Sequence, residues 1–169
     1  MKYLKQLILL FSIVLTTINS FASHIRAGDI IAERISTTDL TYKFTLTLYT
    51  SNDGPQISPN AVIKASDGWE SNAENYISAT DIGNDVTKMV FEFERTFPGP
   101  NFYTITYQEF NRVGGVLNMA SSGSSPFYIE TSIFIDGFLG LNSSPVLLVP
   151  PIDNGATNQI YNYNPGAFD

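Results

Sequence analysis

The side chains of this sequence that could do catalytic chemistry are few and scattered. His24 is the one histidine, and cysteine is absent. An N-terminal copper site would need a second histidine, and a Ser-His-Asp triad would have to use His24 as its base on a frayed chain terminus. His24 is therefore expected to begin the first edge strand, and no catalytic residue is assigned.

Glu92 and Glu94 are the carboxylate pair whose spacing best suits acid–base chemistry. Residues two positions apart on a strand share one face, which brings their carboxylates within the roughly 5 to 9.5 Å that glycosidases use. The same pattern is typical of an ordinary solvated strand face, and we favour that interpretation. The sequence therefore predicts a protein that is not an enzyme.

Asp39, Asp53, Asp67 and Asp81 recur at equal intervals, which raises the question of a metal site. A calcium loop concentrates its oxygen ligands within about a dozen residues, and these four are spread farther apart. Aspartates placed regularly between strands mark turns instead. Neither a metal ligand nor a cofactor is assigned, and calcium bridged between two loops stays open as an alternative.

The aromatic side chains allow two interpretations. Trp69, Tyr49 and Tyr76 could line an exposed sugar-binding face, or they could fill a β-sheet core, which is the commoner role. One exposed patch containing Trp69 and two tyrosines would favour sugar binding, whereas burial would favour a plain scaffold. The run Asn142-Ser143-Ser144 matches a glycosylation acceptor, but it carries no weight because the leader segment is of the bacterial type.

Residues 1–22 have the pattern of a cleavable signal peptide. Lysines precede the apolar run LILLFSIVL, and Ser20 and Ala22 supply the small residues of a cleavage site before Ser23. The run is shorter than the roughly 20 residues that span a bilayer, so no membrane span is expected after cleavage. We expect export to the periplasm, the cell surface or the extracellular space, and the lack of cysteine excludes a lipoprotein.

The mature chain is acidic. The whole sequence has a formal net charge of −7, and cleavage removes two lysines, so the mature chain is more negative still. An acidic surface repels phosphate backbones, so nucleic acid is excluded as an expected partner. Without disulfides, stability must come from the hydrophobic core alone.

Alternation of apolar and polar residues predicts the fold. Clear period-2 stretches lie at residues 42–48, 89–94, 103–108 and 127–135, and weaker strands are expected at 29–35, 61–65, 76–79 and 146–149. Residues 23–151 are predicted to be an all-β domain, an immunoglobulin-like or related two-sheet β-sandwich, with a closed barrel as the alternative. The side chains predicted to point inward are Phe44, Leu46, Phe91, Phe93, Ile105, Ile133 and Ile135.

The C-terminal residues lack this alternation. Residues 152–169 are predicted to be a linker or the start of an incomplete following module, because they are rich in asparagine, glycine and proline. We expect Asn154 to Asp169 to be dispensable for folding of the domain. The alternative is that the apolar side chains of this segment dock on the domain as a final edge strand.

Several segments also resemble one protein family. They are SHIRAGDI at residues 23–30, YKFTLTLYT at 42–50, YTITYQEFNRVGGVLNM at 103–119, SSPFYIETSIFI at 124–135, LNSSPVLLVPPID at 141–153 and YNYNPGAFD at 161–169. This order is similar to the N-terminal region of large surface proteins of Bacteroidetes that are described as gliding-motility-associated or PKD-domain proteins. The resemblance covers the chain from about Ser23 to its last residue.

The resemblance implies an N-terminal β module of a long surface protein that is exported, continues into further immunoglobulin-like modules, and is carried onward by type IX secretion. Members of the family often have a cysteine pair around Tyr49 to Asp53 and another near Asn154 to Asn158. This sequence has none there, so that stapling is lost. The resemblance carries over no catalytic residue.

Three functions remain to be compared. The favoured one is a non-enzymatic secreted or cell-surface module for structure or adhesion, whose partners are other surface proteins or extracellular glycans. The alternative is a carbohydrate-binding module that uses exposed aromatic side chains. The third is a glycosidase built on Glu92 and Glu94, which would require both carboxylates in a deep cleft.

Overall fold

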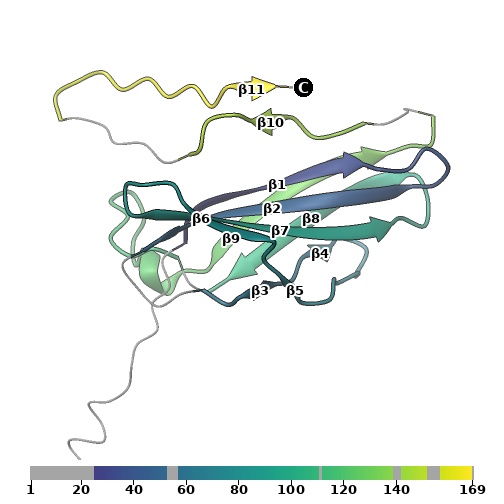
Figure 1. Cartoon of the computed structure of the whole chain (residues 1–169), viewed down its shortest axis with the longest axis horizontal. Coiled ribbons are helices and arrows are strands. Elements are labelled where there is room, and N and C mark those ends of the chain that lie inside the picture. The colour runs from purple at the N-terminus through teal and green to yellow at the C-terminus, as the bar shows by residue number, and fades with distance from the viewer. Residues whose placement is uncertain (1–24, 53–56, 111, 139–141, 152–156, 169) are drawn as a thin grey trace, which may run out of the picture.

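The computed structural model describes residues 25–52, 57–110, 112–138, 142–151 and 157–168, and Figure 1 shows their arrangement. The expected signal peptide with His24, and also Asp53, lie outside these ranges. Within them the one helical segment is the 3₁₀ turn Ser122–Ser124, so the described chain is all-β, as predicted. It contains no helix long and apolar enough to cross a membrane.

The strands form several open antiparallel sheets. Their bounds are β1 Ile25–Arg34, β2 Thr41–Ser51, β3 Asn60–Ala61, β4 Lys64–Ala65, β5 Glu74–Asn75, β6 Ser78–Asp81, β7 Val86–Thr96, β8 Asn101–Glu109, β9 Phe127–Ile135, β10 Val146–Leu147 and β11 Ala167–Phe168. A four-stranded sheet has the order β1-β2-β7-β6, a three-stranded sheet has the order β4-β8-β9, and β3-β5 and β10-β11 form two small ribbons. None of these described sheets closes into a barrel.

The two larger sheets contribute side chains to one hydrophobic core. All seven residues predicted to point inward are buried, at 9 % exposure or less. On the four-stranded sheet, Phe44 lies opposite Phe93 and Leu46 opposite Phe91, so neighbouring strands bury the same face. Because successive side chains on a strand point to opposite faces, this register leaves the alternate residues on the outer faces of the sheets.

The turn from β6 to β7 shows how local sequence sets the register. Gly83, Asn84 and Asp85 have φ angles of 80°, 54° and 60°, in the left-handed region that glycine, asparagine and aspartate tolerate best. Arg26 fastens the turn to β1, because its Nη2 donates to Asp85 Oδ2 at 2.8 Å and to Ser51 Oγ at 2.9 Å. These contacts hold the turn against β1 and so fix the residue at which β7 begins.

Two of the weaker strands expected from the sequence have different bounds in the structure. The stretch 61–65 is divided into β3 and β4, which belong to different sheets. Between them, the Ile63 N–H donates to Ser71 Oγ at 3.0 Å and the Ile63 carbonyl accepts from the Ser71 N–H at 2.9 Å, so a loop residue replaces a strand partner. The strand expected at 76–79 begins only at Ser78.

Residues 143 and 144 lie along the free edge of β1. Ser144 N–H donates to the Ala32 carbonyl at 2.7 Å, and the Ala32 N–H donates to Ser144 Oγ at 3.1 Å. Ser143 forms an antiparallel bridge with Glu33. The candidate glycosylation run therefore adds a short partner to the edge of the four-stranded sheet.

The C-terminal ribbon β10-β11 is a separate two-stranded element (Figure 1), in which Val146 pairs with Phe168. Tyr49 points to the outer face of β2, yet it is only 6 % exposed. The phenol of Tyr163 in the C-terminal segment lies near enough to contribute to the raised pKa of Tyr49, after burial and Asp29. The boundary placed after residue 151 stays a prediction.

Candidate binding face

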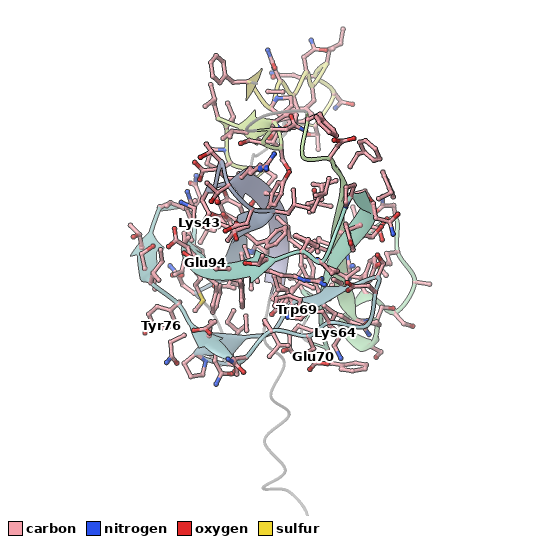
Figure 2. The ribbon with its side chains drawn as sticks, turned by 90° about the vertical axis from the view of Figure 1, so that its right-hand side faces the viewer. Lys43, Lys64, Trp69, Glu70, Tyr76 and Glu94 are labelled. Atoms are coloured by element: carbon pink, nitrogen blue, oxygen red, sulfur yellow. The ribbon has the colours of Figure 1, made fainter. Side chains whose placement is uncertain are left out.

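The glutamate pair lies on the outer face of the four-stranded sheet. Glu92 and Glu94 stand opposite Thr45 and Lys43 of β2, and Figure 2 shows Lys43 and Glu94 as neighbours. Lys43 Nζ is 3.1 Å from a carboxylate oxygen of Glu33 and 3.9 Å from one of Glu92. These contacts, the hydrogen bond from Glu33 first, raise the pKa of Lys43. The pair thus belongs to a ladder of exposed charges.

Glu94 also lines a shallow hollow of about 270 Å³ at the end of β7, together with Trp69, Glu70 and Glu74. Three carboxylates line this hollow, and carboxylate oxygens are common ligands of cations. Among the described residues, however, no group of three or more histidine, aspartate or glutamate side chains converges in metal-binding geometry. We assign no ligand to this hollow.

The described aspartates of the regular series organise separate turns. In each case a carboxylate oxygen accepts the backbone N–H two residues later: Asp39 from Thr41 at 3.1 Å, Asp67 from Trp69 at 3.3 Å and Asp81 from Gly83 at 2.8 Å. This is the Asx-turn hydrogen bond that favours aspartate between strands. The turn interpretation accounts for these three residues.

The three aromatic residues singled out from the sequence lie in different environments. Trp69 is partly buried and its ring stacks on the Arg95 guanidinium, whose Cζ lies 4.7 Å from the ring centroid. Tyr49 is buried, whereas Tyr76 is 43 % exposed and packs edge-on against Phe91. In Figure 2, Tyr76 lies at the left-hand margin of the molecule, apart from Trp69. They do not form one exposed patch.

Arg95 holds Trp69 in place by packing against its ring. Its side chain is 7 % exposed, lies over Phe97 at 4.3 Å as well as over Trp69, and is hydrogen-bonded to the Asp67 carboxylate. That hydrogen bond lowers the pKa of Asp67. A buried cation stacked between aromatic rings and paired with a carboxylate locks the β4–β5 loop onto the core.

A different surface gathers exposed aromatic and hydroxyl groups: the outer face of the β8-β9 pair. We call it the β8-β9 face, and its members are Phe102, Thr104, Thr106 and Gln108 of β8 with Ser132, Glu130, Tyr128 and Phe134 of β9. In register, Phe102 lies opposite Phe134 and Gln108 opposite Tyr128. Phe102 is 60 % exposed and Phe134 51 % exposed. Directly opposed residues place their side chains next to each other on one face, so both rings face solvent at the same end of the pair.

The centre of the β8-β9 face is polar. The hydroxyls of Thr104 and Ser132 are 3.0 Å apart, and the Tyr128 hydroxyl donates to Glu130 Oε2 at 2.6 Å. The latter hydrogen bond raises the pKa of Tyr128, so its phenol stays protonated. The face therefore has rings at both ends and fixed hydrogen-bonding groups between them.

A hollow of about 320 Å³ adjoins this face where the short β4 strand ends beside β8. Thr106 and Gln108 line both the hollow and the face, and Asn60, Lys64 and Glu70 complete its polar wall. Lys64 Nζ is 2.9 Å from Glu70 Oε2, and Figure 2 shows these two side chains next to each other. The pair neutralises its own charges, so the other polar side chains of the hollow are hydroxyl and amide groups and the carboxylate of Glu109.

Sequence reasoning missed this face, although a signal was present. In the strands expected at 103–108 and 127–135, the buried positions were found from their apolar side chains. Tyr128 and Phe134 are aromatic residues at outward positions of the second stretch, and Phe102 is an outward ring of β8 directly before the first. An aromatic residue at a strand position where a polar residue is expected indicates a ring that faces solvent and is not packed in the core.

Comparisons with protein-family models, with curated proteins and with solved structures found no match.

Proposed function

We propose that this chain is a non-enzymatic adhesion module of an exported or cell-surface protein. The single observation that carries the proposal is the exposed ring pair Phe102 and Phe134, side by side on an open sheet face. Apolar side chains grouped on a surface cost solubility unless a partner covers them, so such patches mark interaction sites. An adhesive module needs such a face and no acid–base pair.

The proposal includes the finer architecture. The four-stranded and three-stranded sheets supply one core, which supports an immunoglobulin-like or related two-sheet sandwich behind a cleaved signal peptide. In line with the resemblance of the sequence, we place the module in the N-terminal part of a larger gliding-associated surface protein. Its partners are other surface proteins or extracellular glycans.

The test uses beads coated with the exported protein and washed by shear flow over candidate surfaces, including polysaccharide films and bacterial cells. Adhesion should fall several-fold for Phe134→Ala and stay unchanged for Phe168→Ala, which removes an even more exposed ring from the C-terminal ribbon. Adhesion that is the same for the original protein, both variants and blank beads would reject the proposal.

A carbohydrate-binding role is the second candidate, and one observation favours it. The ring pair is continuous with hydroxyl, amide and carboxylate groups rather than with further apolar side chains. A ligand for this face must therefore offer both apolar and hydrogen-bonding groups.

A further inference from the structure

We infer that the β8-β9 face and the hollow beside it bind an uncharged polysaccharide chain. This inference rests on the proposed function and names the chemical class of its partner. It starts from the order of side chains along β9: a ring at Tyr128, polar groups at Glu130 and Ser132, and a ring at Phe134.

The rings can take the apolar side of a sugar. One face of a pyranose ring presents C–H groups, and these stack on an aromatic ring as other flat apolar surfaces do. Phe102 and Phe134 together offer one broad platform, because they are cross-strand partners and both are more than half exposed. Tyr128 offers a second ring at the other end of the same face.

The groups between the rings can take the hydroxyls of a sugar. Each sugar residue carries hydroxyls that both donate and accept hydrogen bonds. Thr104 and Ser132 supply hydroxyls of the same dual character, Glu130 accepts, and Gln108 supplies both an amide donor and a carbonyl acceptor. The hydrogen bonds already made between Thr104 and Ser132 and between Tyr128 and Glu130 fix the side chains before a ligand arrives.

The dimensions suit a chain rather than a single sugar. Tyr128 and Phe134 are six residues apart on β9, and a strand rises about 3.4 Å per residue, which separates the end rings by about 20 Å. Several consecutive sugar rings fit along this length. The hollow of about 320 Å³ opens beside Thr106 and Gln108 and has room for a branching sugar.

Charge points to an uncharged ligand. The eight side chains of the β8-β9 face include one carboxylate, Glu130, and no cation, in a protein whose formal net charge is −7. Lys64 at the border of the face is paired with Glu70. A phosphorylated or uronic-acid polymer would find no unpaired cation on this face and a negative field around it.

The order of the groups argues against a protein partner. Protein interfaces place large apolar side chains at the centre, where water is excluded, and polar residues at the rim. The β8-β9 face has the opposite order, with Thr104, Ser132 and Glu130 at the centre and the rings at the two ends. A polymer that alternates C–H faces with hydroxyls matches this order.

The test is electrophoresis of the exported protein through native gels that contain one soluble polysaccharide each. The panel includes the uncharged β-glucan, xylan, galactomannan and starch, and the acidic alginate and pectin. At least one uncharged polymer should retard the protein, and the acidic ones should not. Phe102→Ala and Phe134→Ala should each weaken binding about tenfold, because each removes a stacking ring.

Matched variants separate stacking from general damage. Phe134→Tyr keeps a ring and should retain binding, and Phe168→Ala should bind like the original protein. Gln108→Ala should weaken binding several-fold by removing a hydrogen-bonding group from the edge of the hollow. Circular dichroism before each run confirms that the variants are folded, which is expected because the replaced rings lie outside the core.

The outcomes distinguish this inference from the proposed function. If Phe134-dependent adhesion of beads persists while no uncharged polymer retards the protein, the adhesion module stands and the glycan assignment is wrong. Retardation by the acidic polymers alone, or retardation that Phe102→Ala and Phe134→Ala leave unchanged, also overturns it. Sedimentation showing a dimer that Phe134→Ala dissolves would assign the face to a second copy instead.

Discussion

The outer faces of the two larger sheets follow the same alternation but carry different chemistry. On the four-stranded sheet, Lys43 contacts both Glu33 and Glu92, and this group of exposed charges keeps an excess of one carboxylate. On the β8-β9 pair, the cross-strand neighbours Phe102 and Phe134 are instead aromatic and exposed. Both faces cover the same core, so the difference is not required by folding. The comparison separates a face whose exposed side chains are paired charges from a face whose exposed rings we propose as the binding site.

The largest effect should come from the residue beneath the charged face. Phe91 is fully buried, so Phe91→Ala should lower the free energy of unfolding by about 3–5 kcal/mol through lost burial and a cavity. Phe134→Ala, in contrast, should change it by no more than about 0.5 kcal/mol. Urea denaturation of both variants tests the contrast. Equal losses would show that Phe134 belongs to the core and not to a binding surface.

Asp67→Asn should have the next largest effect, because it removes the carboxylate partner of buried Arg95. The expected loss is about 1–3 kcal/mol at neutral pH. Because the hydrogen bond from Arg95 lowers the pKa of Asp67 in the folded protein, this stabilisation is present above the ordinary carboxyl pKa and is lost as pH falls through the lowered value. Asp81→Asn, at another turn, is the control.

The measurement is thermal unfolding across the acidic pH range. The difference between the original protein and Asp67→Asn should shrink as pH falls. A difference that is constant with pH would mean that Arg95 is held by its aromatic neighbours alone.

Asp29 on the outer side of β1 should give a smaller effect of opposite sign. Burial raises the pKa of Asp29, against a hydrogen bond from Thr47 and the charge of Lys88, which both lower it. Stability from this group is therefore greatest below the ordinary carboxyl pKa and falls as pH rises through the raised value. Asp29→Asn should stabilise the protein at pH 7 by less than about 1 kcal/mol, because partial exposure screens the charge. A variant less stable than the original at pH 7 would contradict this account.

The smallest effect is expected for the charged face itself. Glu92→Gln and Glu94→Gln should each change the free energy of unfolding by no more than about 0.5 kcal/mol, since exposed ion pairs contribute little. Bead adhesion and retardation by polysaccharide should both stay at the original level. If either variant abolished adhesion, the assignment of the interaction to the β8-β9 face would be wrong.

The sequence was sufficient to predict the long strands and their buried face but not the short ribbons or the exposed face that we propose for binding. Period-2 alternation located β2, β7, β8 and β9 because burial of one face leaves a local pattern. The opposition of Phe102 and Phe134 depends on the register between two strands joined by a long connection, which no local pattern encodes. The outward rings were visible in the sequence, but their pairing was not.

The environment of Trp69 could not be predicted from the sequence for a related reason. Trp69 was considered for an exposed patch, but its position depends on Arg95, a residue far along the chain whose charged side chain is unexpectedly buried. A charged residue in an alternating strand is normally assigned to the wet face. Only its pairing with Asp67 and the surrounding rings make burial favourable, and these are tertiary contacts.

The serine segment along β1 has a consequence for behaviour at high concentration. An uncovered edge strand is a template onto which another chain can add, and long runs of such pairing lead to aggregates and fibres. Ser144 occupies the N–H and the carbonyl of Ala32, and Pro145, which has no N–H, stops the added ladder from extending. Asp29 and Glu33 place charges on the same strand. The chain thus covers part of its own edge strand at Ala32 and Glu33, and replacing Ser143 to Pro145 with a flexible linker should free this part of β1 to pair with another chain.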